Sequence, residues 1–110
     1  MRDDGYGDVR NRVGTIMQVS GRVDTTTVSE LRDRLHSAVD GGIGVLIIDL
    51  GDVELIDATG LAMLVGTHRR AMRAGRELVL RGTPPRITRL LAATGLDRVL
   101  HSESPSPTAA

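Results

Sequence analysis

An acidic residue, a hydroxyl and a glycine stand together where a predicted strand gives way to a predicted helix. They belong to the tetrapeptide Asp57–Ala58–Thr59–Gly60, and helical spacing of apolar residues begins directly after it at Leu61. Backbone N–H groups at a helix N-terminus lack partners, and the helix dipole is positive there. The tetrapeptide can therefore cap its own helix or hold a phosphate group.

The local chemistry leaves two interpretations of Thr59 open. Thr59 can be a structural N-cap, a role worth about 0.5–2 kcal/mol, or its hydroxyl can be presented for modification. Asp57 is a second residue able to cap the helix, which would leave Thr59 free. Gly60 carries no side chain, so another molecule would have room to approach the hydroxyl.

Two more acids accompany predicted strands. Asp24 follows the first strand, and carboxyl ends of parallel strands meet at one edge of a sheet, so we expect Asp24 and Asp57 on one rim. Solvation of a loop or capping of a turn is the alternative for Asp24. Asp49 interrupts a buried strand and is expected to be paired or partly exposed. Together the three acids are only a weak metal or phospho-acceptor signal, and no metal ligand is predicted.

The predicted second helix carries other features of possible use in binding. Its outer face holds a run of arginines, which predicts either a solvated face or a surface for an acidic partner: Arg69, Arg70, Arg73 and Arg76. Met63 and Gly66 lie off its predicted core stripe. We therefore expect an exposed apolar spot beside Thr59 that suits a protein contact. The histidines, 36, 68 and 101, lack metal-like spacing.

Composition narrows the function further. The chain has 110 residues, enough for one domain, and its 40% apolar content supports an aliphatic core. With one aromatic residue and zero net charge, it is a poor candidate for direct nucleic-acid binding. The absence of cysteine excludes disulfides, thiol catalysis and cysteine-ligated metals. No apolar run approaches the roughly 20 residues of a membrane span, so we expect a cytoplasmic protein without cofactors or membrane contact.

The elements that position these residues alternate between strand and helix, which predicts an α/β domain with parallel pairings. A capping box at Thr27–Glu30 starts the first helix, which Gly41 ends. A loop is expected at Gly51–Leu55. The expected strands are Asp8–Val13 (an optional extra strand), Thr15–Ser20, Val45–Leu50, Glu77–Arg81 and Val99–Leu100, and the later helices run from Leu61 to Gly75 and from Pro84 to Gly95.

Three segments resemble STAS domains, the fold of bacterial anti-sigma factor antagonists. The segment 45–64 (VLIIDLGDVELIDATGLAML) looks like the family's strand, loop, Asp-Ser-Ser/Thr-Gly-Leu and helix. Residues 21–24 with Leu31, and residues 82–96, match its earlier and later motifs in register. The resemblance implies a small mixed β-sheet with about three to four helices. It covers residues 9–101, flanked by an expected flexible start (1–8) and disordered tail (102–110).

The resemblance also implies a function. Unphosphorylated antagonists bind an anti-sigma factor that is a serine/threonine kinase and thereby free a sigma factor. The kinase then phosphorylates the hydroxyl before the glycine, here Thr59, and a PP2C-type phosphatase resets the cycle. The antagonist is not itself an enzyme. The implied partner surface comprises Asp24, Asp57, Ala58, Thr59, Gly60, Leu61 and Met63.

This chain departs from the family pattern in two places. Ala58 replaces the frequent first serine, and Thr59 stands where serine is common in antagonists. Threonine at this position also occurs in STAS domains that serve larger assemblies. Two other functions therefore stay open: a STAS subunit of a signalling scaffold or lipid-transport complex, and a small-molecule binder or enzyme that uses the acidic rim.

Overall fold

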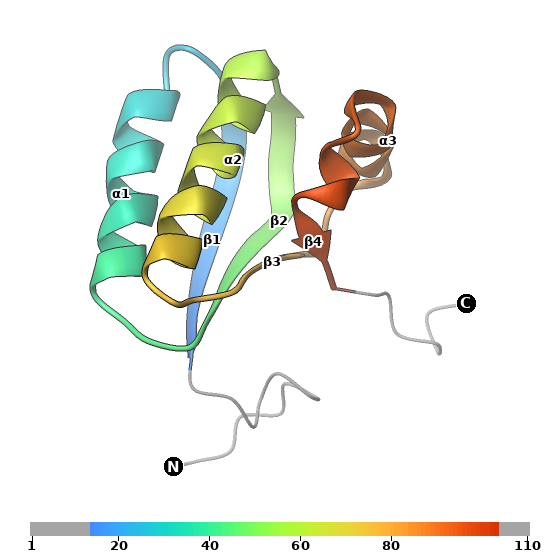
Figure 1. Ribbon diagram of the computed structural model, residues 1–110. Coiled ribbons are helices and arrows are strands. Elements are labelled where there is room, and N and C mark those ends of the chain that lie inside the picture. Colours follow the sequence, from blue (N-terminus) through green and yellow to red (C-terminus); the bar gives the residue numbers. More distant parts are fainter. Residues whose placement is uncertain (1–13, 104–110) are drawn as a thin grey trace.

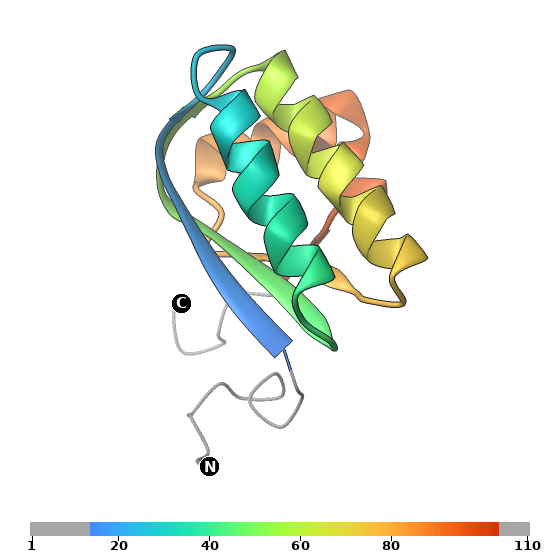
Figure 2. The ribbon, with the colours of Figure 1, turned by 90° about the vertical axis from the view of Figure 1, so that its left-hand side faces the viewer.

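The computed structural model describes residues 14–103, which form a parallel sheet covered by helices on one face. Its strands are β1 (Gly14–Val23), β2 (Val45–Ile56), β3 (Leu78–Arg81) and β4 (His101–Ser102), in the order β1-β2-β3-β4. Its helices are α1 (Val28–Asp40), α2 (Ala58–Arg73) and α3 (Pro85–Thr94), followed by the 3-10 turn η2 (Leu96–Arg98). Helices α1 and α2 lie side by side across the sheet, and α3 lies beyond α2 (Figures 1 and 2).

The predicted α/β fold is confirmed, and its strand pairings are parallel throughout the described range. The expected mixed sheet requires an antiparallel strand, which residues 14–103 do not contain. The optional strand at 8–13, the flexible start and nearly all of the predicted tail lie outside the described residues. The last predicted strand is shifted, because Leu96–Arg98 forms a 3-10 turn and the strand is His101–Ser102.

Strand β2 is longer than predicted. The expected loop at Gly51–Leu55 is wrong, because these residues continue pairing with β1 as far as the partners Val23 and Ile56. Two register shifts in this stretch accommodate the unequal lengths of the strands. Pairing to the very end of both strands brings the start of α2 directly against the end of β1, where the backbone N–H of Asp57 donates to the carbonyl of Val23 (3.2 Å).

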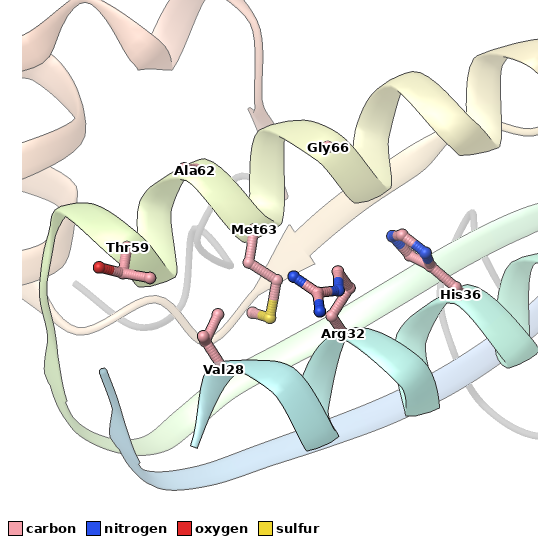
Figure 3. Close-up of a pocket in the computed structure, with 7 residues that line it drawn as sticks. All are labelled: Val28, Arg32, His36, Thr59, Ala62, Met63 and Gly66. Carbon is pink, nitrogen blue, oxygen red and sulfur yellow. The ribbon is translucent and has the colours of Figure 1, made fainter. Parts of the chain in front are cut away.

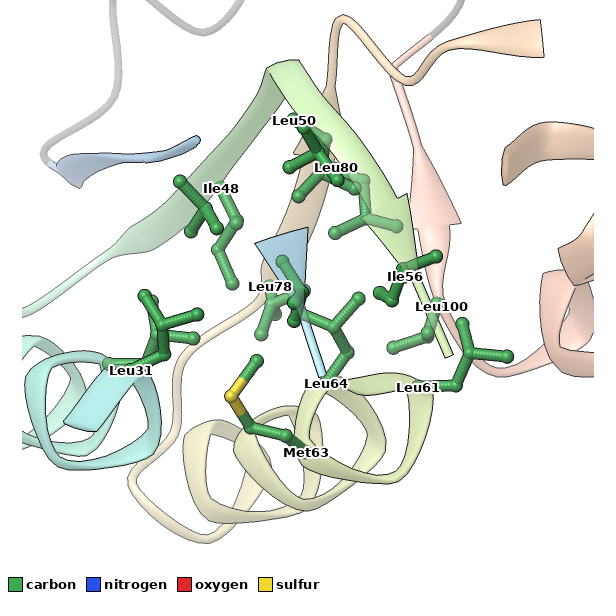
Figure 4. Packing of buried hydrophobic residues seen from close by; sticks show 14 of the residues in the cluster. Leu31, Ile48, Leu50, Ile56, Leu61, Met63, Leu64, Leu78, Leu80 and Leu100 are labelled. Carbon is green, nitrogen blue, oxygen red and sulfur yellow. The ribbon is translucent and has the colours of Figure 1, made fainter. Parts of the chain in front are cut away.

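The core follows from alternation along the strands and helical spacing on the helices. Leu46, Ile48 and Leu50 of β2 face the helices, and Val45 and Ile47 are also buried, as expected for a central strand. Figure 4 shows the helix-facing layer meeting leucines from α1 and α2. The largest fully buried side chains of the core are Val19, Val23, Leu35, Val39, Leu46, Ile48, Leu50, Leu64, Leu78, Leu80, Leu91 and Leu100.

The four arginines predicted on the outer face of the second helix differ in their exposure and contacts. Arg69 and Arg73 are exposed, and Arg70 pairs with Asp40 (2.7 Å). Arg76 is only 4% exposed, so the prediction of a solvated side chain is wrong there. Its guanidinium donates to Thr15 Oγ1 and to five carbonyl oxygens where α1 turns into β2: those of Ala38, Val39, Ile43, Gly44 and Val45.

Candidate functional site

Asp57 caps helix α2. Its backbone is extended, and its side-chain Oδ1 accepts a hydrogen bond from the Gly60 N–H at 3.0 Å. Its carbonyl accepts from the Leu61 N–H at 2.9 Å, which starts the helical ladder. The structure thus decides between the two possible caps, and the interpretation of Thr59 as the N-cap is wrong. Ala58 is exposed as the first helical residue.

Thr59 is the second residue of α2 and is half-buried. Its hydroxyl makes no hydrogen bond with any residue of the described range 14–103. Figure 3 shows the hydroxyl oxygen pointing away from Val28, with the methyl group on the side of the neighbouring helix. A hydroxyl that is neither a cap nor a partner of another side chain can be modified without removing a bond from the fold.

Gly60 is needed for packing within the chain. A Cβ built on Gly60 would lie 2.7 Å from the Val23 carbonyl oxygen and 2.7 Å from side-chain carbons of Val23 and Ile56. Real side chains do not tolerate such distances, so the first turn of α2 can approach β1 only with glycine here. The expectation that Gly60 leaves space for another molecule is therefore wrong, because the chain itself fills that space.

Asp24 lies at the same edge of the sheet as Asp57, as predicted, but it is buried (6% exposed). Its carboxylate accepts from the Thr26 N–H (2.9 Å), the Thr26 hydroxyl (2.6 Å) and the Arg22 guanidinium (2.9 Å). These contacts, led by the Thr26 hydroxyl, lower the pKa of Asp24. The turn-capping alternative describes Asp24 better than an exposed contact residue.

The predicted capping box at the start of α1 is not formed. Thr27 occupies the N-cap position, but its hydroxyl makes no cap hydrogen bond. Instead it donates to the Arg22 carbonyl (2.9 Å) and accepts from the Asp24 N–H (3.1 Å). The hydroxyl therefore closes the turn between β1 and α1, which holds Asp24 in place.

Met63 and Leu61 are core residues, 5% and 6% exposed respectively. The expectation of an exposed Met63 is wrong, because α2 contacts both the sheet and α1 and so buries more than one stripe (Figure 4). Met72 has the helical spacing of Leu61 and Leu64 but lies near the end of α2 and is 62% exposed. Of the seven predicted contact residues, Asp57, Ala58 and Thr59 thus retain side chains that are not buried.

A shallow groove between α1 and α2 begins at Thr59 (Figure 3). Its volume is about 220 Å³, and Met63 lies in its wall. Sequence reasoning missed the α1 side of this groove. A spacing of four residues does place the three α1 side chains on one helix face, but no local signal shows that this face meets Thr59. The lining residues are Val28, Arg32, His36, Thr59, Ala62, Met63 and Gly66.

Two other titratable groups, Asp49 and His36, are influenced by their surroundings in the fold. Asp49 pairs with Arg81 (3.0 Å) and accepts from the Gly51 N–H (2.8 Å), which confirms the expected pairing. Burial is the main cause of a lowered pKa at His36, with Arg70 and Arg32 adding to it. Within residues 14–103, no three His, Cys, Asp or Glu side chains are arranged to hold a metal ion, and no helix has the length and apolar character of a membrane span.

Comparison with known proteins identifies the family of this chain. The family model for the STAS domain matches residues 6–109. The anti-sigma-B factor antagonist of Staphylococcus aureus (strain NCTC 8325 / PS 47) is 34% identical over 85 residues, which are 77% of this chain and 79% of that protein. Such relatives are regulatory binding proteins rather than enzymes.

Solved structures share the architecture. An anti-sigma factor antagonist from Mycobacterium paratuberculosis superposes with a TM-score of 0.73 at 26% identity, covering 87% of this chain and 81% of that one. A sulfate transporter family protein from Wolinella succinogenes superposes with a TM-score of 0.67 at 25% identity, covering 89% and 82%. The chain belongs to the STAS domain family.

Proposed function

We propose that this protein is a cytoplasmic anti-sigma factor antagonist controlled by phosphorylation of Thr59. In its unphosphorylated form it binds an anti-sigma factor with serine/threonine kinase activity, and a sigma factor is released. The observation that carries the proposal is the uncommitted hydroxyl of Thr59, beside a helix cap that Asp57 supplies. The 34% identity to a protein named as an antagonist supports the role.

The contact surface is the exposed part of the tetrapeptide. Asp57, Ala58 and Thr59 face outward at the edge where β1 and β2 end. The buried residues predicted with them hold this edge in shape. Gly60 lets α2 approach β1, Leu61 anchors the first turn in the core, and Asp24 closes the preceding turn. Their effect on binding would be indirect.

Phosphorylation would transfer the γ-phosphoryl group of ATP to Thr59 Oγ1, with loss of the hydroxyl proton and release of ADP. The modified residue gains about −1.5 to −2 charges. The fold can tolerate this charge because the Thr59 hydroxyl takes part in no hydrogen bond of the described residues and stands at the positive end of a helix.

At an interface the same charge would lie near the Asp57 carboxylate and would have to lose water against the partner, which disfavours binding. Hydrolysis of the phosphate ester by a PP2C-type phosphatase would restore the binding form.

The test is a pull-down from the native host with the immobilised protein, with and without ATP. We expect a kinase-like anti-sigma factor to be retained without ATP and released with it, as Thr59 gains about 80 Da, one phosphoryl group. Thr59→Ala should retain the partner in both conditions. Thr88→Ala, an exposed threonine on α3, is the matched control and should behave as wild type.

A second candidate function is a STAS subunit of another assembly. The similarity to a sulfate transporter family protein, at 25% identity, favours it. In that case the pull-down would return a partner whose retention ignores ATP, with Thr59 unmodified. That outcome would contradict the phosphorylation switch and leave Thr59 as an ordinary residue in the first turn of α2.

A further inference from the structure

The groove beside Thr59 contains one arginine, Arg32, whose charge is not paired within residues 14–103. Arg32 of α1 is exposed and makes no hydrogen bond or ion pair with any residue of the described chain. Other arginines at this end of the domain are engaged. Arg22 pairs with Asp24 (2.9 Å), and Arg86 donates to the Glu54 carbonyl (2.8 Å). Arg32 is thus available to an anion that enters the groove.

The direction of the Arg32 side chain brings it toward Thr59. Helices α1 and α2 both follow the carboxyl ends of parallel strands, so their N-termini lie at the same edge. Side chains on a helix lean toward its N-terminus. Arg32 therefore leans toward the end of the groove where Val28 and Thr59 lie. Figure 3 shows its guanidinium between the two helices, next to Met63.

We propose that Arg32 binds the phosphoryl group of phosphorylated Thr59 across the α1–α2 groove. This inference rests on the phosphorylation proposed above. Threonine uses two χ1 rotamers in helices, and rotation about χ1 is the movement that would bring Oγ1 to the groove side, where the methyl group now lies. The phosphate adds reach and three acceptor oxygens, which match the planar donor fork of an arginine.

A contact between Arg32 and the phosphate would offset the repulsion between the phosphate and the acidic groups around it. The charged and titratable groups at this end include Asp57 at the α2 cap, the Asp24–Arg22 pair after β1, and Glu54 near the end of β2. On α1, His36 lies one turn beyond Arg32, and its burial disfavours the charged imidazolium. Arg32 is therefore the cation of α1 within the groove that faces the phosphate.

The test installs phosphothreonine at position 59 during translation, so that no kinase is needed. The second pKa of the phosphate, ordinarily about 6, is then measured by ³¹P NMR at about 0.15 M salt, where the screening length is about 8 Å. An opposite charge favours the dianion and lowers this pKa. We expect Arg32→Gln to raise it by about 0.5 unit or more relative to the otherwise unchanged phosphoprotein.

Arg34→Gln is the matched control. Arg34 is also exposed on α1 but lies two residues on, about 200° around the helix and outside the groove. Its substitution should move the pKa by less than about 0.1 unit, since exposed charges at a distance are screened. Equal shifts in the two variants, or none in either, would overturn the proposal. Failure of Thr59 phosphorylation in the host would instead count against the proposed function and leave this contact standing.

Discussion

The Asp57 carboxylate accepts the Gly60 N–H at 3.0 Å, and this one hydrogen bond assigns different roles to neighbouring polar residues. Asp57 is committed to the fold as the cap of α2. Thr59, between the two bonded residues, has a hydroxyl with no hydrogen-bond partner among residues 14–103. Such a site can be modified without loss of structure, which is what a reversible switch requires.

This division of roles predicts unequal costs of mutation. Asp57→Ala should lower the free energy of unfolding by about 1 kcal/mol through loss of the cap. Thr59→Ala should change it by no more than about 0.5 kcal/mol. Urea denaturation of both variants measures the difference. A Thr59→Ala protein destabilised as much as Asp57→Ala would show that the hydroxyl does stabilise the helix.

Two glycines of α2 form a matched pair. Gly60→Ala places a methyl group 2.7 Å from Val23 and Ile56 atoms and should cost about 1–3 kcal/mol of stability. Gly66→Ala meets no atom within 4 Å and should add about 0.5–1 kcal/mol, because alanine is the better helix former. Thermal or urea unfolding gives both values. Similar effects of the two substitutions would contradict the close contact at Gly60.

Among the arginines of α2 and of the turn that follows it, Arg76 should contribute most to stability. Arg76→Met keeps much of the apolar stem but leaves carbonyl oxygens at the α1–β2 turn, among them those of Ala38 and Gly44, without a donor. We expect a loss of about 2–4 kcal/mol, given the cost of buried unsatisfied groups. Arg73→Met, on the exposed surface, should stay within about 0.5 kcal/mol. Unfolding curves for the pair test this contrast.

Asp24 should make folding sensitive to acid. Its pKa is lowered in the folded state, first by the Thr26 hydroxyl, from a usual value of 3.8. The unfolded chain then binds the proton more readily. The stabilisation is therefore present above pH 3.8 and is lost as the pH falls through the lower folded value.

Asp24→Asn should accordingly have a smaller difference in unfolding free energy between neutral and acidic pH than wild type. Thr26→Val, which removes the 2.6 Å hydroxyl contact, should change the profile in the same direction. Urea titrations from pH 7 to pH 2.5 provide the comparison. Profiles parallel to wild type for both variants would exclude Asp24 as a source of acid sensitivity.

A negative charge at position 59 should weaken partner binding more than a larger neutral side chain does. Thr59→Glu adds a negative charge near Asp57, whereas Thr59→Gln has nearly the same size and no charge. Near-complete switching requires a difference in binding free energy of about 5.5 kcal/mol, and glutamate imitates phosphate only in part. We therefore expect Thr59→Glu to lose part of the affinity for the partner and Thr59→Gln to lose less. Calorimetry with the captured partner measures both. Equal losses would point to steric exclusion instead of charge.

Much of the fold is determined by local sequence. The apolar run Val45–Leu50, broken only by Asp49, predicts a strand buried on both faces, and the burial of its apolar residues confirms it. Helical spacing after Val28 predicts α1, and the glycine at position 95 predicts the end of α3. Both predictions lie close to the observed helix ends, and the structure places Gly95 in the left-handed region. These signals are local because propensity, capping and periodicity act over a few residues.

Tertiary structure alone decided the identity of the helix cap and the environment of the side chains around Thr59. Asp57 and Thr59 are both capable caps, and the choice depends on where the Asp57 backbone joins β1. Met63 and Arg76 are buried by segments distant in sequence, and Arg32 meets the Thr59 groove because α1 packs on α2. Sequence periodicity shows which residues share a face of a helix, but what that face contacts depends on how distant elements pack.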